Sequence, residues 1–135
     1  MKPMKIVKFY IIDEEREVAG FGPVLLADHV ECADRFFTRL RGLLGRTDLP
    51  EGHGLLLSPC GAIHCSGMKF SIDAVFLSGG KDGEFQVLRV AEHLAPGARA
   101  AHKGAKHVLE LTAGRAEARG LREGQRIAMD DGESR

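Results

Sequence analysis

The stretch IDAVFLSGGKDGEFQVLRV, residues 72–90, decides the fold class. Its first part, Ile72 to Leu77, is apolar apart from Asp73, and a short run of this kind is typical of a mostly buried strand. Ser78 to Gly83 has the Gly, Lys and Asp composition of a hairpin loop, and Phe85 to Val90 has the pattern of a partner strand. Residues 72–90 therefore predict a β-hairpin within a β-rich domain.

Further strands are predicted on both sides of this hairpin, because short runs of β-branched, aromatic and aliphatic residues alternate with Gly and Pro punctuation. The predicted strands are residues 6–12, 24–31, 55–57, 105–111 and 126–129. Turns or loops are expected at 18–23, 47–54 and 122–125, and after Pro96-Gly97 in a basic stretch that contains Arg99, His102 and Lys103. Residues 114–120 predict a single helical turn.

One longer helix is predicted over residues 34–45. Asp34 is a good N-cap because its carboxylate can accept from free backbone N–H groups of the first turn. Apolar residues then recur at helical spacing and form one stripe, which includes Phe36, Phe37 and Leu40. Gly45 is placed to end the helix in a left-handed conformation.

Many short strands with one amphipathic helix favour a mainly β fold, a small barrel-like or jelly-roll-like β-sandwich with the helix packed against one side. The chain of 135 residues fits a single domain. We expect this domain to cover residues 1–129 and the acidic, Gly-containing residues 130–135 to be a frayed tail.

Composition limits the class of partner. Nineteen basic and nineteen acidic residues give no net charge, which makes nucleic acid an unfavoured partner. The start of the chain lacks the pattern of a signal peptide, and no segment is apolar enough to span a bilayer, so we expect a soluble, cytoplasmic protein without a membrane partner. The three cysteines are then expected to be reduced thiols. No cofactor is indicated, and the oligomeric state stays open.

Six ordered segments resemble a known family, the one catalogued as domain of unknown function number 192. They are RLRGLLGR (39–46), GLLL (54–57), PCGAIH (59–64), MKFSIDAVFL (68–77), VLELTAG (108–114) and GQRI (124–127). The sequence departs from the pattern at Cys65, where threonine is more usual, and at Ser71, where proline is usual. The resemblance implies a mostly β, barrel-like or jelly-roll-like fold and implies no activity.

Cys60, His64 and Cys65 are the densest group of chemically active side chains. Thiolate and imidazole are zinc ligands, and a cysteine beside a histidine has the elements of thiol catalysis. However, the spacing matches no standard zinc motif, and adjacent residues on a strand point to opposite faces. The favoured interpretation is therefore a small apolar cysteine and a hydrogen-bonded histidine.

Two carboxylates, Asp73 and Glu110, lie in apolar runs, where an unpaired charge is costly. Arg39 and Arg46 are their expected partners. The favoured interpretation is an internal network of ion pairs or hydrogen bonds, and the alternative is a polar pocket in which the arginines bind an anion.

The leading functional hypothesis is a non-catalytic binding module. Its expected ligand is a small molecule or a peptide, held in a cleft near His64 and Asp73. The candidate ligand-binding residues are His64, Met68, Asp73, Glu110, Arg39 and Arg46. One alternative is a metal-binding protein or thiol/histidine-dependent enzyme that uses Cys60, His64 and Cys65. A second alternative is an assembly role through an exposed strand edge.

Overall fold

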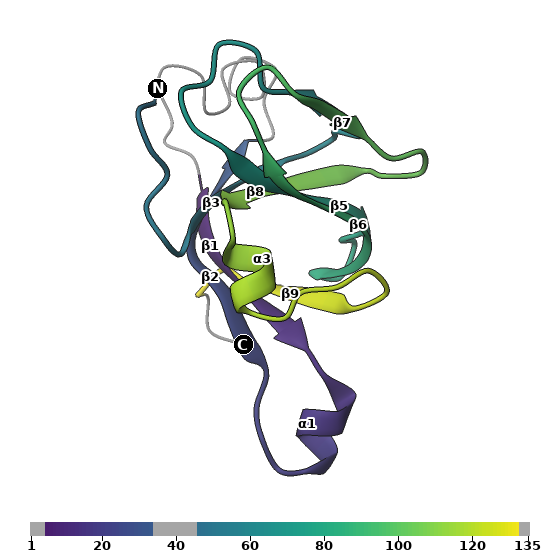
Figure 1. The fold of residues 1–135 in the computed structure, drawn as a ribbon. Helices are drawn as coiled ribbons and strands as arrows, with labels where there is room; N and C mark the ends of the chain where they lie inside the picture. Colours follow the sequence, from purple (N-terminus) through teal and green to yellow (C-terminus); the bar gives the residue numbers. More distant parts are fainter. Residues whose placement is uncertain (1–4, 34–45, 133–135) are drawn as a thin grey trace.

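The computed structural model describes residues 5–33 and 46–132. A closed barrel of seven strands in the order β1-β2-β3-β8-β5-β6-β9 forms the body of the molecule (Figure 1). The barrel strands are β1 (Lys5–Ile12), β2 (Val24–Ala33), β3 (His53–Leu57), β5 (Ile72–Gly79), β6 (Glu84–Leu94), β8 (His107–Thr112) and β9 (Arg126–Asp130). β2 and β3 pair in parallel, whereas the other neighbours pair antiparallel.

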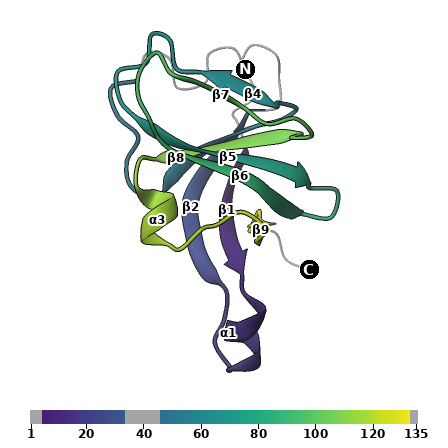
Figure 2. The ribbon, with the colours of Figure 1, turned by 45° about the vertical axis from the view of Figure 1, so that its right-hand side comes forward.

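A second layer lies outside the barrel. β4 (Ala62–His64) and β7 (Arg99–Ala101) form a two-stranded antiparallel ribbon that covers one side of the barrel (Figure 2). The short helix α1 (Glu14–Val18) lies at the far end of the molecule, on the β1–β2 connection, and α3 (Arg115–Ala118) lies beside an end of the barrel.

Side-chain alternation gives the barrel two apolar surfaces. The inner surface is the main core, in which Phe9, Leu26, Val75 and Leu109 are among the buried residues. The outer surface of β3, β8 and β5 packs against the ribbon and its connecting loops in two smaller clusters. Strands buried on both faces have no polar alternation, which explains the nearly continuous apolar run of β5.

The mainly β, barrel-like prediction is confirmed, and the 72–90 hairpin forms β5 and β6, which extends to Leu94. The helical turn predicted at 114–120 is α3. The helix predicted for residues 34–45 lies outside the described residues.

The structure differs from the sequence predictions in three places. The strand predicted over residues 105–111 begins at His107 and not at Ala105, because the Ala105 N–H donates to the carbonyl of His102 in a turn. Residues 99–101 form β7 and not a loop, paired with β4, which was not predicted. Helix α1 was also missed, although Asp13 caps it by accepting from the backbone N–H groups of Glu15 and Arg16.

None of the helices within residues 5–33 and 46–132 has the length and apolarity that crossing a bilayer requires.

Candidate functional site

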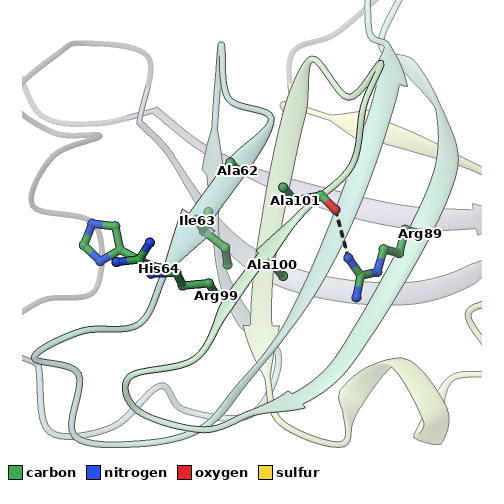
Figure 3. A pocket seen from close by; sticks show the side chains of 7 residues that line it. All are labelled: Ala62, Ile63, His64, Arg89, Arg99, Ala100 and Ala101. Carbon is green, nitrogen blue, oxygen red and sulfur yellow. Dashed lines mark hydrogen bonds between the residues drawn. The ribbon is translucent and has the colours of Figure 1, made fainter.

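A cleft of about 520 Å³ lies between the β4–β7 ribbon and β6 (Figure 3). Its walls combine small apolar side chains with basic ones. The lining residues are Ala62, Ile63, His64, Arg89, Arg99, Ala100 and Ala101. The lining contains no carboxylate, so the cleft has an apolar floor and a positive rim.

Pairing between β4 and β7 places these residues. Ile63 lies opposite Ala100, and both pack toward the barrel wall in one apolar cluster. His64 lies opposite Arg99 at the end of the ribbon, and both side chains are exposed there. Among the described residues, neither the imidazole of His64 nor the guanidinium of Arg99 has a hydrogen-bond partner. Both are therefore available to a ligand.

Arg89 closes the opposite side of the cleft from β6. Its Nη1 donates to the carbonyl oxygen of Ala101 at 2.8 Å, and its guanidinium carbon lies 5.8 Å from the centre of the Phe76 ring. This hydrogen bond crosses from the barrel to β7 in Figure 3 and fixes the orientation of the planar cation. The remaining N–H donors of Arg89 stay in position to meet an anion.

Asp73 lies away from this cleft and is fully buried at one end of the barrel. Its Oδ1 accepts from the N–H of His93 at 2.9 Å, and its Oδ2 accepts from the N–H groups of Gly114 and Ala116, both at 3.0 Å. The N-cap Gly114 has no side chain to cap α3, so Asp73 caps this short helix from β5. Among the described residues, Asp73 thus meets backbone amides and not the expected Arg46, and it does not line the cleft.

Glu110 lies on the outer face of β8 and is 5% exposed. Burial raises the pKa of its carboxyl from 4.5 to about 7, against the opposing effect of Arg46. Arg46 is drawn to a second carboxylate, because its Nη2 lies 2.6 Å from Oε2 of Glu31. The strand register places Glu31 and Glu110 on either side of Leu55, so two acids share one arginine. Arg46 is near Glu110 as expected; Arg39 lies outside the described residues.

The sequence group Cys60, His64 and Cys65 does not form a metal cluster. The thiol of Cys65 is fully buried, and its pKa is raised by burial and by Glu110. The thiol of Cys60 donates to the carbonyl of Ala62 at 3.2 Å, whereas His64 is exposed. Within the described part of the chain, no group of three His, Cys, Asp or Glu residues is arranged to hold a metal ion. Met68 is half-buried against the apolar cluster that contains Cys65.

Of the predicted site residues that the structure describes, only His64 lines the cleft. Arg89 and Arg99 were missed as ligand contacts, although Arg99 belongs to the basic stretch noted in the sequence. The sequence does contain a signal for Arg89, because a charged residue in the middle of a half-apolar strand indicates a candidate functional contact.

Comparisons with known proteins place the chain in a family. The family model DUF192, described as "Uncharacterized ACR", matches residues 22–129, and the chain belongs to this family. No curated protein matches the chain.

Two crystal structures have the same fold. A candidate transcription regulator from Sinorhizobium meliloti 1021 is 21% identical, with a TM-score of 0.76 over 96% of this chain and 97% of that chain. A protein of unknown function from Novosphingobium aromaticivorans DSM 12444 is 20% identical, with a TM-score of 0.70 over 90% of this chain and 84% of that chain. At these identities the likeness concerns the fold alone.

Proposed function

We propose that this member of the DUF192 family is a non-catalytic binding module that holds a small organic anion in the β4–β7 cleft. The observation that carries the proposal is that one cavity combines an apolar floor with two guanidinium groups, those of Arg89 and Arg99. Pockets for small molecules are mostly apolar and carry a few polar groups that fix the orientation of the ligand.

The chemistry of the lining selects a ligand with two parts. Arg89 is held by its bond to Ala101, and Arg99 is exposed without a partner among the described residues, so each can donate to an anionic group of a ligand from its own side of the cleft (Figure 3). Ile63, Ala62 and Ala101 offer contacts to an apolar group on the same molecule. A peptide ending in an apolar residue carries the same combination through its terminal carboxylate.

Volume supports a ligand of modest size. A cavity of about 520 Å³ lies within the usual range for small-molecule pockets. We therefore expect an organic acid or phosphate ester with a short aliphatic or aromatic body, and no covalent chemistry at the cleft.

The test is a thermal-shift screen followed by calorimetric titration. The panel pairs apolar carboxylates, phosphate monoesters and short peptides with their uncharged amides or alcohols. We expect anions to stabilise the protein and their neutral partners to have no effect. Arg99→Gln should weaken binding roughly tenfold or more, because it removes a charge-assisted contact. Arg119→Gln, an exposed arginine at the end of α3, is the matched control and should bind as the wild type does.

Two results would overturn the proposal: neutral analogues that bind as well as the anions, or equal affinity in the Arg99→Gln variant. Ala101→Trp adds an independent check, because a bulky side chain at this exposed position fills the cleft without replacing a charge. It should abolish binding while leaving the unfolding transition unchanged.

A further inference from the structure

A second group of chemically active side chains lies outside the cleft, on the outer face of β2 and β3. His29 and His53 are direct partners in the parallel register of these strands. Their rings stack with centroids 4.3 Å apart and planes inclined by 24°. Paired residues on neighbouring parallel strands direct their side chains to the same face of the sheet, so the two imidazoles project from the barrel side by side.

The ring nitrogens of this pair have no protein partner among the described residues. Both residues are half-buried, so part of each residue remains accessible to water. By contrast, the His107 ring is held between Ser58 Oγ and the carbonyl of Gly79. The imidazole nitrogens of His29 and His53 are therefore available to bind a common ion.

We propose that His29 and His53 form a two-histidine binding site for a divalent ion of the late first transition row, such as Ni²⁺, Cu²⁺ or Zn²⁺. Neutral imidazole is a preferred ligand of these ions. Two nitrogens bound at ~2.0 Å with a tetrahedral angle are roughly 3.3 Å apart, a separation that paired side chains on neighbouring strands about 4.8 Å apart can reach. Because the lone pair of each nitrogen lies in its ring plane, the two rings must turn out of the stack before one nitrogen of each binds the same ion.

The coordination is open. The described residues hold no set of three potential ligands, so the protein supplies two nitrogens and water or a small exogenous ligand completes the shell. An open shell of this kind exposes the ion to solutes. Nitrogen ligands bind Cu²⁺ more tightly than Ni²⁺ or Zn²⁺, so we expect the same order of affinity here. The pair takes no part in the lining of the cleft, so the inference is independent of the proposed function.

The experiment titrates NiCl₂ and ZnCl₂ into the reduced full chain by calorimetry at pH 7.5. We expect one saturable site per chain. His53→Gln and His29→Gln should each weaken binding at least tenfold, and the double variant should remove the saturable heat. His102→Gln, at a half-buried histidine on the β7–β8 connection, is the matched control and should leave the affinity unchanged. Circular dichroism melting of each variant verifies that the fold is intact.

Cysteine thiols are the main competing ligands, so the titration is repeated in Cys60→Ser. Binding should persist in that variant and remain sensitive to His53→Gln. Cu²⁺ paramagnetic resonance gives a second readout, because two coordinated imidazoles produce nitrogen hyperfine coupling that His53→Gln reduces. The inference fails if either single histidine variant binds as tightly as the wild type, if no saturable site exists, or if Cys60→Ser alone removes binding.

Discussion

β5 and β8 each bury one carboxylate, and the two lie one step apart in the same ladder on opposite sides of the barrel wall. Asp73 pairs with Leu111 and lies on the inner side, whereas Glu110 pairs with Ala74 and lies on the outer side beneath the second layer. Both are almost inaccessible to solvent. The difference between them is the set of donors that each one meets.

Asp73 meets three backbone N–H groups, from His93, Gly114 and Ala116. Backbone donors are fixed in direction by the fold, so this carboxylate links β6 and the start of α3 to β5 at one end of the barrel. His93 has a φ of 53°, a left-handed conformation that is uncommon for a side chain of this kind, and its bond to Asp73 stabilises it.

Glu110 meets no hydrogen-bond donor among the described residues, and Arg46, the cation that lowers its pKa, is paired with Glu31. Burial alone then favours the neutral carboxyl. The comparison teaches that two buried carboxyl groups have opposite roles. Asp73 stabilises the fold by accepting backbone hydrogen bonds, whereas Glu110 limits stability when it ionises.

The largest expected effect is therefore at Asp73. Asp73→Ala leaves three backbone N–H groups without this acceptor, and the buried one, from Ala116, costs about 1–3 kcal/mol by itself. Asp73→Asn should be less damaging than alanine, because its amide oxygen still accepts. The measurement is the free energy of unfolding from urea titration. Asp82→Ala is the control, since Asp82 accepts one backbone bond in an exposed turn and should lose less than about 1 kcal/mol. Equal losses in the two alanine variants would break the comparison.

An intermediate effect, with the opposite sign, is expected at Glu110. Its carboxyl titrates near 7 in the folded chain and near its ordinary 4.5 when unfolded. The folded state therefore holds more protons between these values, and stability falls as pH rises from 4.5 to 7 and is constant above. The loss amounts to roughly 3 kcal/mol. Glu110→Gln should remove this slope, matching the wild type near pH 4.5 and exceeding its stability at pH 8.

Urea titrations at several pH values check this expectation. Glu31→Gln is a useful companion variant, because it frees Arg46 to pair with Glu110. That change should lower the pKa of Glu110 and move the loss of stability to lower pH. A Glu110→Gln chain that keeps the wild-type dependence of stability on pH, or that is less stable than the wild type at pH 8, would support the ion-pair network that the sequence favoured.

Much of the barrel is predictable from the sequence, because its strands are long enough to show pattern. The 72–90 segment carries both an apolar run and a hairpin loop, and these determine β5 and β6 without tertiary information. β4 and β7 have three residues each, too few for any periodicity, and their pairing joins segments 35 or more positions apart. The ribbon, and with it the cleft, was therefore invisible to sequence reasoning.

The candidate site is less predictable still. The sequence shows that Asp73 needs a partner, but the backbone amides that satisfy it come from residues 41 and 43 positions later. The stacking of His29 on His53 depends on the parallel register of β2 and β3, which no local pattern encodes. His64 was predicted because a histidine is a candidate ligand contact by residue type alone. Arg89 and Arg99 become candidates only when the structure shows that they line the same cleft.

The smallest effect is expected at the opposite end of the barrel, where a serine and a histidine side chain form the connecting hydrogen bonds. Ser58 Oγ lies 2.5 Å from His107 Nδ1, and His107 Nε2 lies 2.8 Å from the carbonyl of Gly79. Because a carbonyl only accepts, Nε2 carries the proton and Nδ1 accepts from the Ser58 hydroxyl. These bonds tie the ends of β3, β5 and β8 together.

Ser58→Ala should therefore cost only about 1 kcal/mol, since the ring is half-buried and water can replace the lost donor. Imidazole ¹⁵N shifts should show the Nε2–H tautomer in the wild type and a mixture of tautomers in the variant. A double-mutant cycle with His107→Phe isolates the Ser58–His107 bond from other contacts of the serine. A coupling of several kcal/mol would mean that this end of the barrel depends on its hydrogen bonds as strongly as the Asp73 end. A coupling near zero would mean that packing of His107 against Phe85, with centroids 5.1 Å apart, holds this end instead.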